Sequence, residues 1–304
     1  MKKNQLGTSN LFVSEIGFGC MSLSDDNAAN QIIIDEAIDR GINYFDTADL
    51  YQLGFNEETV GKALKGKRDK VILASKGGNE WGDGIDGWRW NPRKSYIKSA
   101  LKDSLRRLDV DYLDLYQLHG GTIDDPIDEV IDAFEELSKE GTVRYYGISS
   151  IRPNVIKKFA ENSNIVSVMM QYSILDRRPE EWFSLFDKHG ISIISRGPVA
   201  KGLLTDDYQR RVTEKGYLDF TSDELNEVLP QLKQLAMDKG MTMQQLSLRY
   251  VIDQLPVATA VAGASQRSQL LENIQSSNVP ELPHQLISDI QRIVKKSVYE
   301  NHRR

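Results

Sequence analysis

The sequence has a single cysteine, Cys20, so no intrachain disulfide can form. It has no apolar run long enough to cross a bilayer. The two lysines that follow Met1 precede no apolar stretch of the kind found in secretory signals. These absences lead us to expect a cytoplasmic protein that makes no contact with a membrane.

Positive charge is also in deficit. The 38 lysines and arginines are outnumbered by 44 aspartates and glutamates, which gives a net charge of −6. Because a nucleic-acid-binding surface needs an excess of cations, no nucleic-acid partner is expected. No Pro-, Gly- or Ser-rich linker divides the 304 residues, and this length is usual for one α/β barrel. We therefore expect residues 1–304 to form a single domain.

Motifs for hydrolysis, phosphoryl transfer and metal binding are missing. The four histidines do not have the spacing of metal ligands, and neither a serine elbow nor a P-loop occurs. The segment Gly82–Gly87 matches a dinucleotide-binding pattern by letter, but its two aspartates would repel phosphate and no helix start follows it. We interpret that match as chance in a surface loop, and we expect no metal site.

What the sequence does contain is an alternation of short β-branched runs and longer amphipathic stretches, which is typical of βα units. The predicted strands are Ile16–Met21, Ile42–Ala48, Val71–Lys76, Leu113–His119, Tyr145–Ser149, Val166–Tyr172, Ile191–Ser195 and Thr259–Ala264. The predicted helices span 28–40, 93–108, 126–140, 179–189, 223–239, 242–254 and 283–297.

Eight strands with intervening helices predict a closed (β/α)₈ TIM barrel with extra helices. An open doubly wound sheet, which usually has fewer strands, is the alternative. Before the first of these strands, the turn residues Gly7–Asn10 lie between two short extended runs. They predict an N-terminal β-hairpin that caps the barrel floor.

Polar side chains end three successive predicted strands. Asp46 lies at the end of the second strand with Tyr51 five residues later, Lys76 ends the third, and His119 ends the fourth. Each of these residues alone is more often structural than functional. Because the active site of such a barrel lies at the carboxyl ends of its strands, we expect all four side chains to meet at one rim.

At this rim the chain resembles a known family. Phe45–Ala48 with Tyr51, followed by Gly54, Glu57, Glu58 and Gly61, resembles the signature of the aldo-keto reductases. The resemblance continues in order through Ser75-Lys76, Asp111–His119, Gly147–Ser149, Gln171-Tyr172, Pro198–Leu204, Gly263–Ser265, Gln269, Glu272 and Asn273. It implies an enzyme that passes hydride between NADPH and a small carbonyl substrate, an aldehyde or a ketone.

The resemblance also implies a role for each catalytic candidate. Tyr51 would act as the general acid that protonates the carbonyl oxygen. The Lys76 ammonium would favour the phenolate, and Asp46 would hold Lys76 in place. His119 would hydrogen-bond the substrate oxygen and orient the carbonyl.

Residues after the remaining strands are implied to bind the cofactor. Ser149 and Gln171 would hold the nicotinamide carboxamide, and Arg196 stands where many family members stack a tyrosine on that ring. Arg267 would clamp the adenosine 2′-phosphate at a helix start, because a guanidinium makes bidentate contacts to such groups. The other implied cofactor residues are Cys20, Met21, Gly197, Pro198, Val199, Gly202, Ser265, Gln269, Glu272 and Asn273.

The substrate end is less defined. Loop 77–92 carries Trp81, Trp88 and Trp90, which either line the substrate pocket or pack against neighbouring helices. Phe55 and Tyr172 are expected near the same mouth. Two other functions stay open: a nucleotide-binding regulatory or sensor protein of the same fold with slow turnover, and an NAD-dependent alcohol or polyol dehydrogenase.

Overall fold

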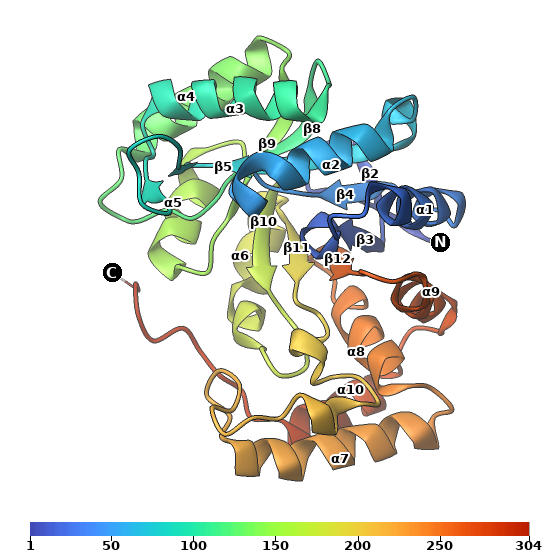
Figure 1. Cartoon of the computed structure of the whole chain (residues 1–304). Coiled ribbons are helices and arrows are strands. Elements are labelled where there is room, and N and C mark those ends of the chain that lie inside the picture. Colours follow the sequence, from blue (N-terminus) through green and yellow to red (C-terminus); the bar gives the residue numbers. More distant parts are fainter. Residues whose placement is uncertain (304) are drawn as a thin grey trace.

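The computed structural model describes residues 1–303 and contains a closed barrel of parallel strands (Figure 1). Around the barrel the strand order is β10-β11-β12-β3-β4-β5-β8-β9. The barrel strands are β3 (Ile16–Gly19), β4 (Tyr44–Asp46), β5 (Ile72–Gly77), β8 (Leu113–Leu118), β9 (Val143–Ser149), β10 (Ser167–Gln171), β11 (Ser192–Arg196) and β12 (Val257–Gly263). Each predicted strand is present, so the closed barrel is confirmed and the open sheet is not the fold.

Helices surround the barrel, as predicted. They are α1 (Asn27–Asp39), α2 (Phe55–Leu64), α3 (Lys94–Leu108), α4 (Ile127–Lys139), α5 (Pro153–Asn162), α6 (Phe183–His189), α7 (Ser222–Asp238), α8 (Met243–Ile252), α9 (Arg267–Gln275) and α10 (His284–Ile293). The extra helices α7 and α10 lie together beside the barrel, at the bottom of Figure 1. Within residues 1–303, no helix combines the length and apolarity needed to span a membrane.

Local signals explain several helix starts. Thr221 and Thr242 each form a capping box at the start of α7 and α8, with Glu224 and Gln245 as the reciprocal partners. The predicted helix 179–189 instead opens with the 3₁₀ segment Arg178–Trp182 and becomes α-helical only at Phe183. The predicted helix 283–297 ends earlier, at Ile293.

The N-terminal hairpin closes the floor of the barrel, as expected. Its strands β1 (Lys3–Gln5) and β2 (Phe12–Ser14) pair antiparallel, and Leu6, Leu11 and Val13 are buried. These three side chains pack against residues inside the barrel: Tyr44, Ile72, Ala74, Leu115, Val166, Met169, Ile194, Ala258 and Val261. Ser192, at the first residue of β11, accepts a hydrogen bond from Gly7 N at 2.8 Å, which places the hairpin at the amino ends of the strands.

Candidate active site

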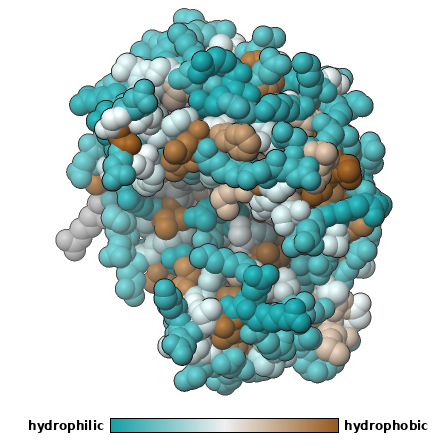
Figure 2. Space-filling model, viewed as in Figure 1, coloured by the Kyte–Doolittle hydropathy of each residue, from teal (hydrophilic) through white to brown (hydrophobic). Residues whose placement is uncertain are grey.

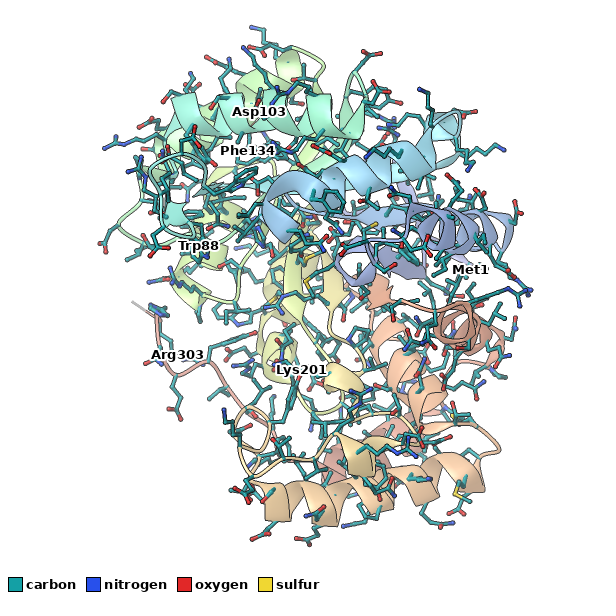
Figure 3. The ribbon with its side chains drawn as sticks, in the orientation of Figure 1. Met1, Trp88, Asp103, Phe134, Lys201 and Arg303 are labelled. Atoms are coloured by element: carbon teal, nitrogen blue, oxygen red, sulfur yellow. The ribbon has the colours of Figure 1, made fainter. Side chains whose placement is uncertain are left out.

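A cavity of about 1290 Å³ opens at the carboxyl ends of the barrel strands. Its lining residues come from the ends of β3, β4 and β8–β12, from the segments that follow them, from the loop after β5 and from α8. Figure 3 labels two of them, Trp88 from the loop after β5 and Lys201 from the loop after β11. In the same orientation, the space-filling view shows a recess near the middle of the face, with scattered apolar side chains around it (Figure 2).

Lys76 connects the catalytic candidates. Its Nζ atom donates to Asp46 Oδ1 at 2.5 Å, to the Thr47 carbonyl at 2.8 Å and to the Tyr51 hydroxyl at 3.2 Å. Lys76 is fully buried behind Tyr51, whereas Tyr51 and Asp46 line the cavity. The contacts predicted between these three residues are therefore present.

The charge on Lys76 is stabilised by its partners. Burial alone would lower the pKa of Lys76, but Asp46 and Tyr51 hold that pKa above its ordinary value. Asp46 in turn accepts hydrogen bonds from Gln117 Nε2 at 3.2 Å and from the Tyr44 hydroxyl at 3.4 Å. The ammonium and the carboxylate form a buried, hydrogen-bonded pair next to the Tyr51 hydroxyl.

A short 3₁₀ segment, Tyr51–Gly54, carries Tyr51. Gln52 (φ 50°), Leu53 (φ 48°) and Gly54 (φ 86°) all adopt left-handed backbone, a region that favours glycine. Immediately afterwards, buried Glu57 on α2 accepts from Ser75 Oγ at 2.5 Å and from Arg107 Nε at 2.7 Å. This anchor ties the start of α2 to β5 and so limits the movement of the turn that carries Tyr51.

His119 stands across from Tyr51. The two rings meet edge-to-face with their centroids 5.9 Å apart, and His119 lines the cavity. Burial, together with the charges of Lys76 and Arg196, lowers the pKa of His119 to about 3, so the imidazole is neutral at physiological pH. Among residues 1–303, its buried Nδ1 atom has no hydrogen-bond partner. A neutral histidine at the cavity wall is suited to contact a polar ligand atom.

The candidate cofactor residues divide into those that line the cavity and those that do not. The lining members are Met21, Ser149, Gln171, Arg196, Gly197, Pro198, Val199, Gly202, Ser265, Gln269, Glu272 and Asn273. Cys20 instead packs in the core between barrel and helices, and burial raises the pKa of its thiol. Arg267 pairs with Glu36 on α1, at 2.6 and 3.0 Å, and does not line the cavity.

Some of the aromatic residues expected at the substrate end line the cavity, and others do not. Trp88 and Trp90 line the cavity, while Trp81 lies against the Arg107 guanidinium at 5.3 Å. Tyr172 is buried and donates to Glu180 at 3.2 Å, and Phe55 lies outside the lining. The expectation that Phe55 and Tyr172 line the mouth is therefore not met, because Phe55 lies outside the cavity lining and Tyr172 is buried with its hydroxyl bound to Glu180. Of the two alternatives for the tryptophans, Trp81 follows the packing one and Trp88 and Trp90 the lining one.

Several cavity residues were not anticipated from the sequence. The Tyr217 hydroxyl, from the long segment between β11 and α7, accepts from Gln171 Nε2 at 2.9 Å. Gln244 on α8 donates to Asn273 at 2.8 Å.

Within residues 1–303, no group of three or more His, Cys, Asp or Glu side chains is arranged to hold a metal ion.

Asp49, two residues before Tyr51, is a second buried carboxyl close to the site. It is 1% exposed, and within residues 1–303 its Oδ1 atom has no hydrogen-bond partner. Burial, reinforced by the Glu57 carboxylate, raises the pKa of Asp49 from 3.8 to about 8. The folded protein therefore keeps a proton on Asp49 that the unfolded chain loses once the pH exceeds 3.8.

This difference predicts a pH-dependent stability. Since only the folded state retains the proton, the free energy of unfolding should fall as the pH rises from 3.8 to about 8, with no further loss from this group above that range. Asp49→Asn should remove this slope and be a few kcal/mol more stable than the wild type at the alkaline end. Urea unfolding across the range measures the effect, with Asp83→Asn in the exposed loop as the control. Equal slopes in wild type and Asp49→Asn would contradict the prediction.

The parallel eight-stranded barrel, with its Tyr-Lys-Asp cluster and neutral histidine at the carboxyl rim, agrees with the resemblance to the aldo-keto reductases seen in the sequence. A family model described as "Aldo/keto reductase family" matches residues 15–295, and the chain belongs to this family of oxidoreductases. Members of this family typically use a nicotinamide cofactor and act on small carbonyl compounds.

Relatives match the chain over most or all of its length. It is 53% identical to "Uncharacterized oxidoreductase YqkF" of Bacillus subtilis (strain 168), over 100% of both chains. The solved holo form of aldo-keto reductase AKR11C1 from Bacillus halodurans shares 55% identity, with a TM-score of 0.94 and 100% of both chains covered. "Aldo-keto reductase yakc [NADP(+)]" of Schizosaccharomyces pombe (strain 972 / ATCC 24843) is 29% identical, covering 88% of this chain and 84% of the relative.

Proposed function

We propose that residues 1–304 act as one barrel domain that reduces a small aldehyde or ketone to the alcohol with NADPH, and that Tyr51 is the general acid. The observation that carries this proposal is the contact of Lys76 Nζ with both Asp46 Oδ1 and the Tyr51 hydroxyl at the cavity wall. A buried ammonium beside the hydroxyl stabilises the negative charge that develops on its oxygen when the proton is donated to the carbonyl.

Each of the catalytic candidates has a separate role in the proposed reaction. The Lys76 ammonium stabilises negative charge on the Tyr51 oxygen as that oxygen donates its proton to the carbonyl. Asp46 fixes Lys76 so that the ammonium remains directed at the hydroxyl. Neutral His119 orients the same carbonyl oxygen from the other side, because its low pKa keeps it from taking the proton itself. The product hydroxyl then carries the proton that Tyr51 has lost, and Tyr51 is reprotonated from solvent.

The cavity fits a nicotinamide dinucleotide. It extends from Tyr51 and His119, past Gln171 and Arg196, to the start of α9. Its far end offers the Ser265 hydroxyl and the backbone of Gln266 and Ser268, which open the helix and suit a phosphate group. When bound, the cofactor supplies the hydride that the carbonyl carbon accepts.

Turnover itself is the direct test. The purified protein is given NADPH and a panel of aldehydes, dicarbonyls and ketones, and loss of absorbance by the reduced nicotinamide is followed. Turnover that needs both cofactor and carbonyl supports the proposal. Tight binding of NADPH without turnover on any compound would instead favour a sensor or regulatory role, and alcohol oxidation with a preference for NAD would favour a dehydrogenase.

NADPH is proposed over NADH because one relative is named for NADP(+) and because α9 begins beside the cavity with Arg267. In the Arg267–Glu36 pair the Arg267 side chain is 56% exposed, while Glu36 is 16% exposed and also binds Arg40. Because solvent screens the arginine and Glu36 keeps Arg40 as a partner, a phosphate can displace Glu36 from Arg267. Arg267→Ala should lower kcat/KM for NADPH by about tenfold while leaving that for NADH unchanged.

Glu36→Gln is the matched variant. It frees the guanidinium of Arg267 without removing it, so kcat/KM for NADPH should stay the same or rise. A preference of the wild type for NADH, or equal losses with both cofactors in Arg267→Ala, would remove Arg267 from the proposed phosphate site.

A further inference from the structure

We propose that Arg196 makes the site bind the reduced nicotinamide cofactor more tightly than the oxidised one, because it places an unpaired cationic side chain in the section of the cavity that the ring occupies. This inference rests on the proposed function and goes further, since it assigns a residue that distinguishes the two redox forms.

Arg196 is held in the cavity wall. It is the last residue of β11, and its register partners are Gln171 on β10 and Val261 on β12, both of which also line the cavity. The Arg196 Nη1 atom donates to Gln171 Oε1 at 3.1 Å. The nitrogen of the same amide donates to the Tyr217 hydroxyl at 2.9 Å, so the Gln171 oxygen is directed at Arg196. This chain of contacts fixes the guanidinium at the carboxyl rim of the barrel.

The charge of Arg196 is not neutralised by a partner. Within residues 1–303, it forms no ion pair, and two acidic side chains of the same region are bound to other arginines. Asp176 pairs with Arg178 at 2.7 Å, and Glu181 pairs with Arg303 at 3.0 Å. The field of Arg196 also reaches the catalytic end, since it is one of the charges that lower the pKa of His119.

The ring has to lie close to this charge. The carbonyl that receives hydride sits against Tyr51 and His119, so the reacting ring must occupy the neighbouring part of the cavity. From there the cavity continues past Gln171 and Arg196 to Gly197–Gly202 and the start of α9, where the phosphates and adenosine fit. The stretch that remains for the ring is therefore lined by Arg196.

The reduced and oxidised cofactors differ by one positive charge on the ring. Repulsion between that charge and a guanidinium a few ångströms away, in a partly solvated site, weakens binding of the oxidised form by about tenfold. The overall equilibrium of the reaction is unchanged. What changes is that the oxidised product leaves readily, so the enzyme continues to reduce its substrate when NADP⁺ is abundant.

The test compares dissociation constants for NADPH and NADP⁺ in the same protein by quenching of tryptophan fluorescence. Arg196→Met removes the charge at similar length, and the ratio of the NADP⁺ constant to the NADPH constant should fall about tenfold. Arg196→Lys keeps the charge and should keep most of the ratio. Lys201→Met removes another cavity cation, placed toward the phosphates, and should weaken both forms alike.

The inference would be overturned if the ratio of the NADP⁺ to the NADPH dissociation constant were unchanged in Arg196→Met, or if it fell as much in Arg196→Lys as in Arg196→Met. Binding of adenosine 2′,5′-bisphosphate, which has no nicotinamide, distinguishes a wrong role for Arg196 from a misfolded variant and from a wrong cofactor assignment. If Arg196→Met binds that compound as the wild type does, the variant is folded and the ratio is a valid measurement. If the wild type does not bind it, the proposed cofactor assignment fails, and this inference falls with it.

Discussion

Replacing Tyr51 with phenylalanine should lower kcat for carbonyl reduction by about 10³-fold or more while leaving the dissociation constant of NADPH nearly unchanged. The substitution removes only the hydroxyl that Lys76 contacts at 3.2 Å. The ring would keep its edge-to-face contact with His119, so the cavity retains its shape. The loss should therefore appear in the chemical step, and kcat and cofactor affinity measured on the same preparation separate the two effects.

Tyr145→Phe is the matched control. The Tyr145 hydroxyl likewise accepts a hydrogen bond at 3.2 Å, but from the backbone Asn10 N at the floor of the barrel. Loss of that hydroxyl should leave turnover as in the wild type. If Tyr51→Phe retained wild-type turnover, another group would have to donate the proton, and the role of Tyr51 would be rejected.

The second large effect is expected for Lys76→Met, in stability as well as activity. The side chains of Lys76 and Asp46 are 1% and 5% exposed, so removing the ammonium leaves a buried carboxylate without its counter-charge. Breaking such a pair on one side costs about 3–5 kcal/mol of folding free energy. Turnover should also fall by about 10²-fold or more, because the Tyr51 hydroxyl loses its cationic neighbour.

The double variant Lys76→Met/Asp46→Asn distinguishes the two losses. Without the stranded carboxylate, much of the stability should return, whereas the activity should stay low. Lys65→Met, which removes an exposed lysine, controls for a change in net charge. A Lys76→Met protein as stable as the wild type in urea unfolding would show that the buried pair is not held as described.

The barrel could be predicted because its signals are local. Each strand is a short apolar run bounded by polar turns, and the count of eight limits the architecture. Three helices are absent from the predicted spans: α9, whose start only the family resemblance implied, and α2 and α5, which were missed altogether. In α5 the signal was present, since Pro153 opens the helix and Val155, Ile156 and Phe159 follow at helical spacing. In α2 four polar residues separate Phe55 from Val60 and Gly61 interrupts the apolar positions, so the periodicity is weak.

The site residues could be predicted where a reactive side chain lies directly at the end of a strand, as with Asp46, Lys76 and His119. The parts of the site that depend on contacts between segments far apart in the sequence could not be predicted. Nothing in the sequence shows that Glu36 lies beside Arg267, because these residues are 231 positions apart. The contact of Tyr217 with Gln171 could not be predicted either, because Tyr217 lies in a long segment without regular periodicity and meets Gln171 only in the folded barrel.

The first residues of the chain and the last described ones lie at opposite ends of the barrel, which determines where a surface or a fused protein can be attached without blocking the cavity. The N-terminal strand Lys3–Gln5 belongs to the floor hairpin, away from the cavity. The other end of the chain runs beside the start of α5 at the rim, where Asn154 N donates to the His302 carbonyl at 2.8 Å. A surface linkage or a fused partner introduced at Met1 would leave the mouth of the cavity facing solution. The same addition beyond residue 303 would stand next to the entrance.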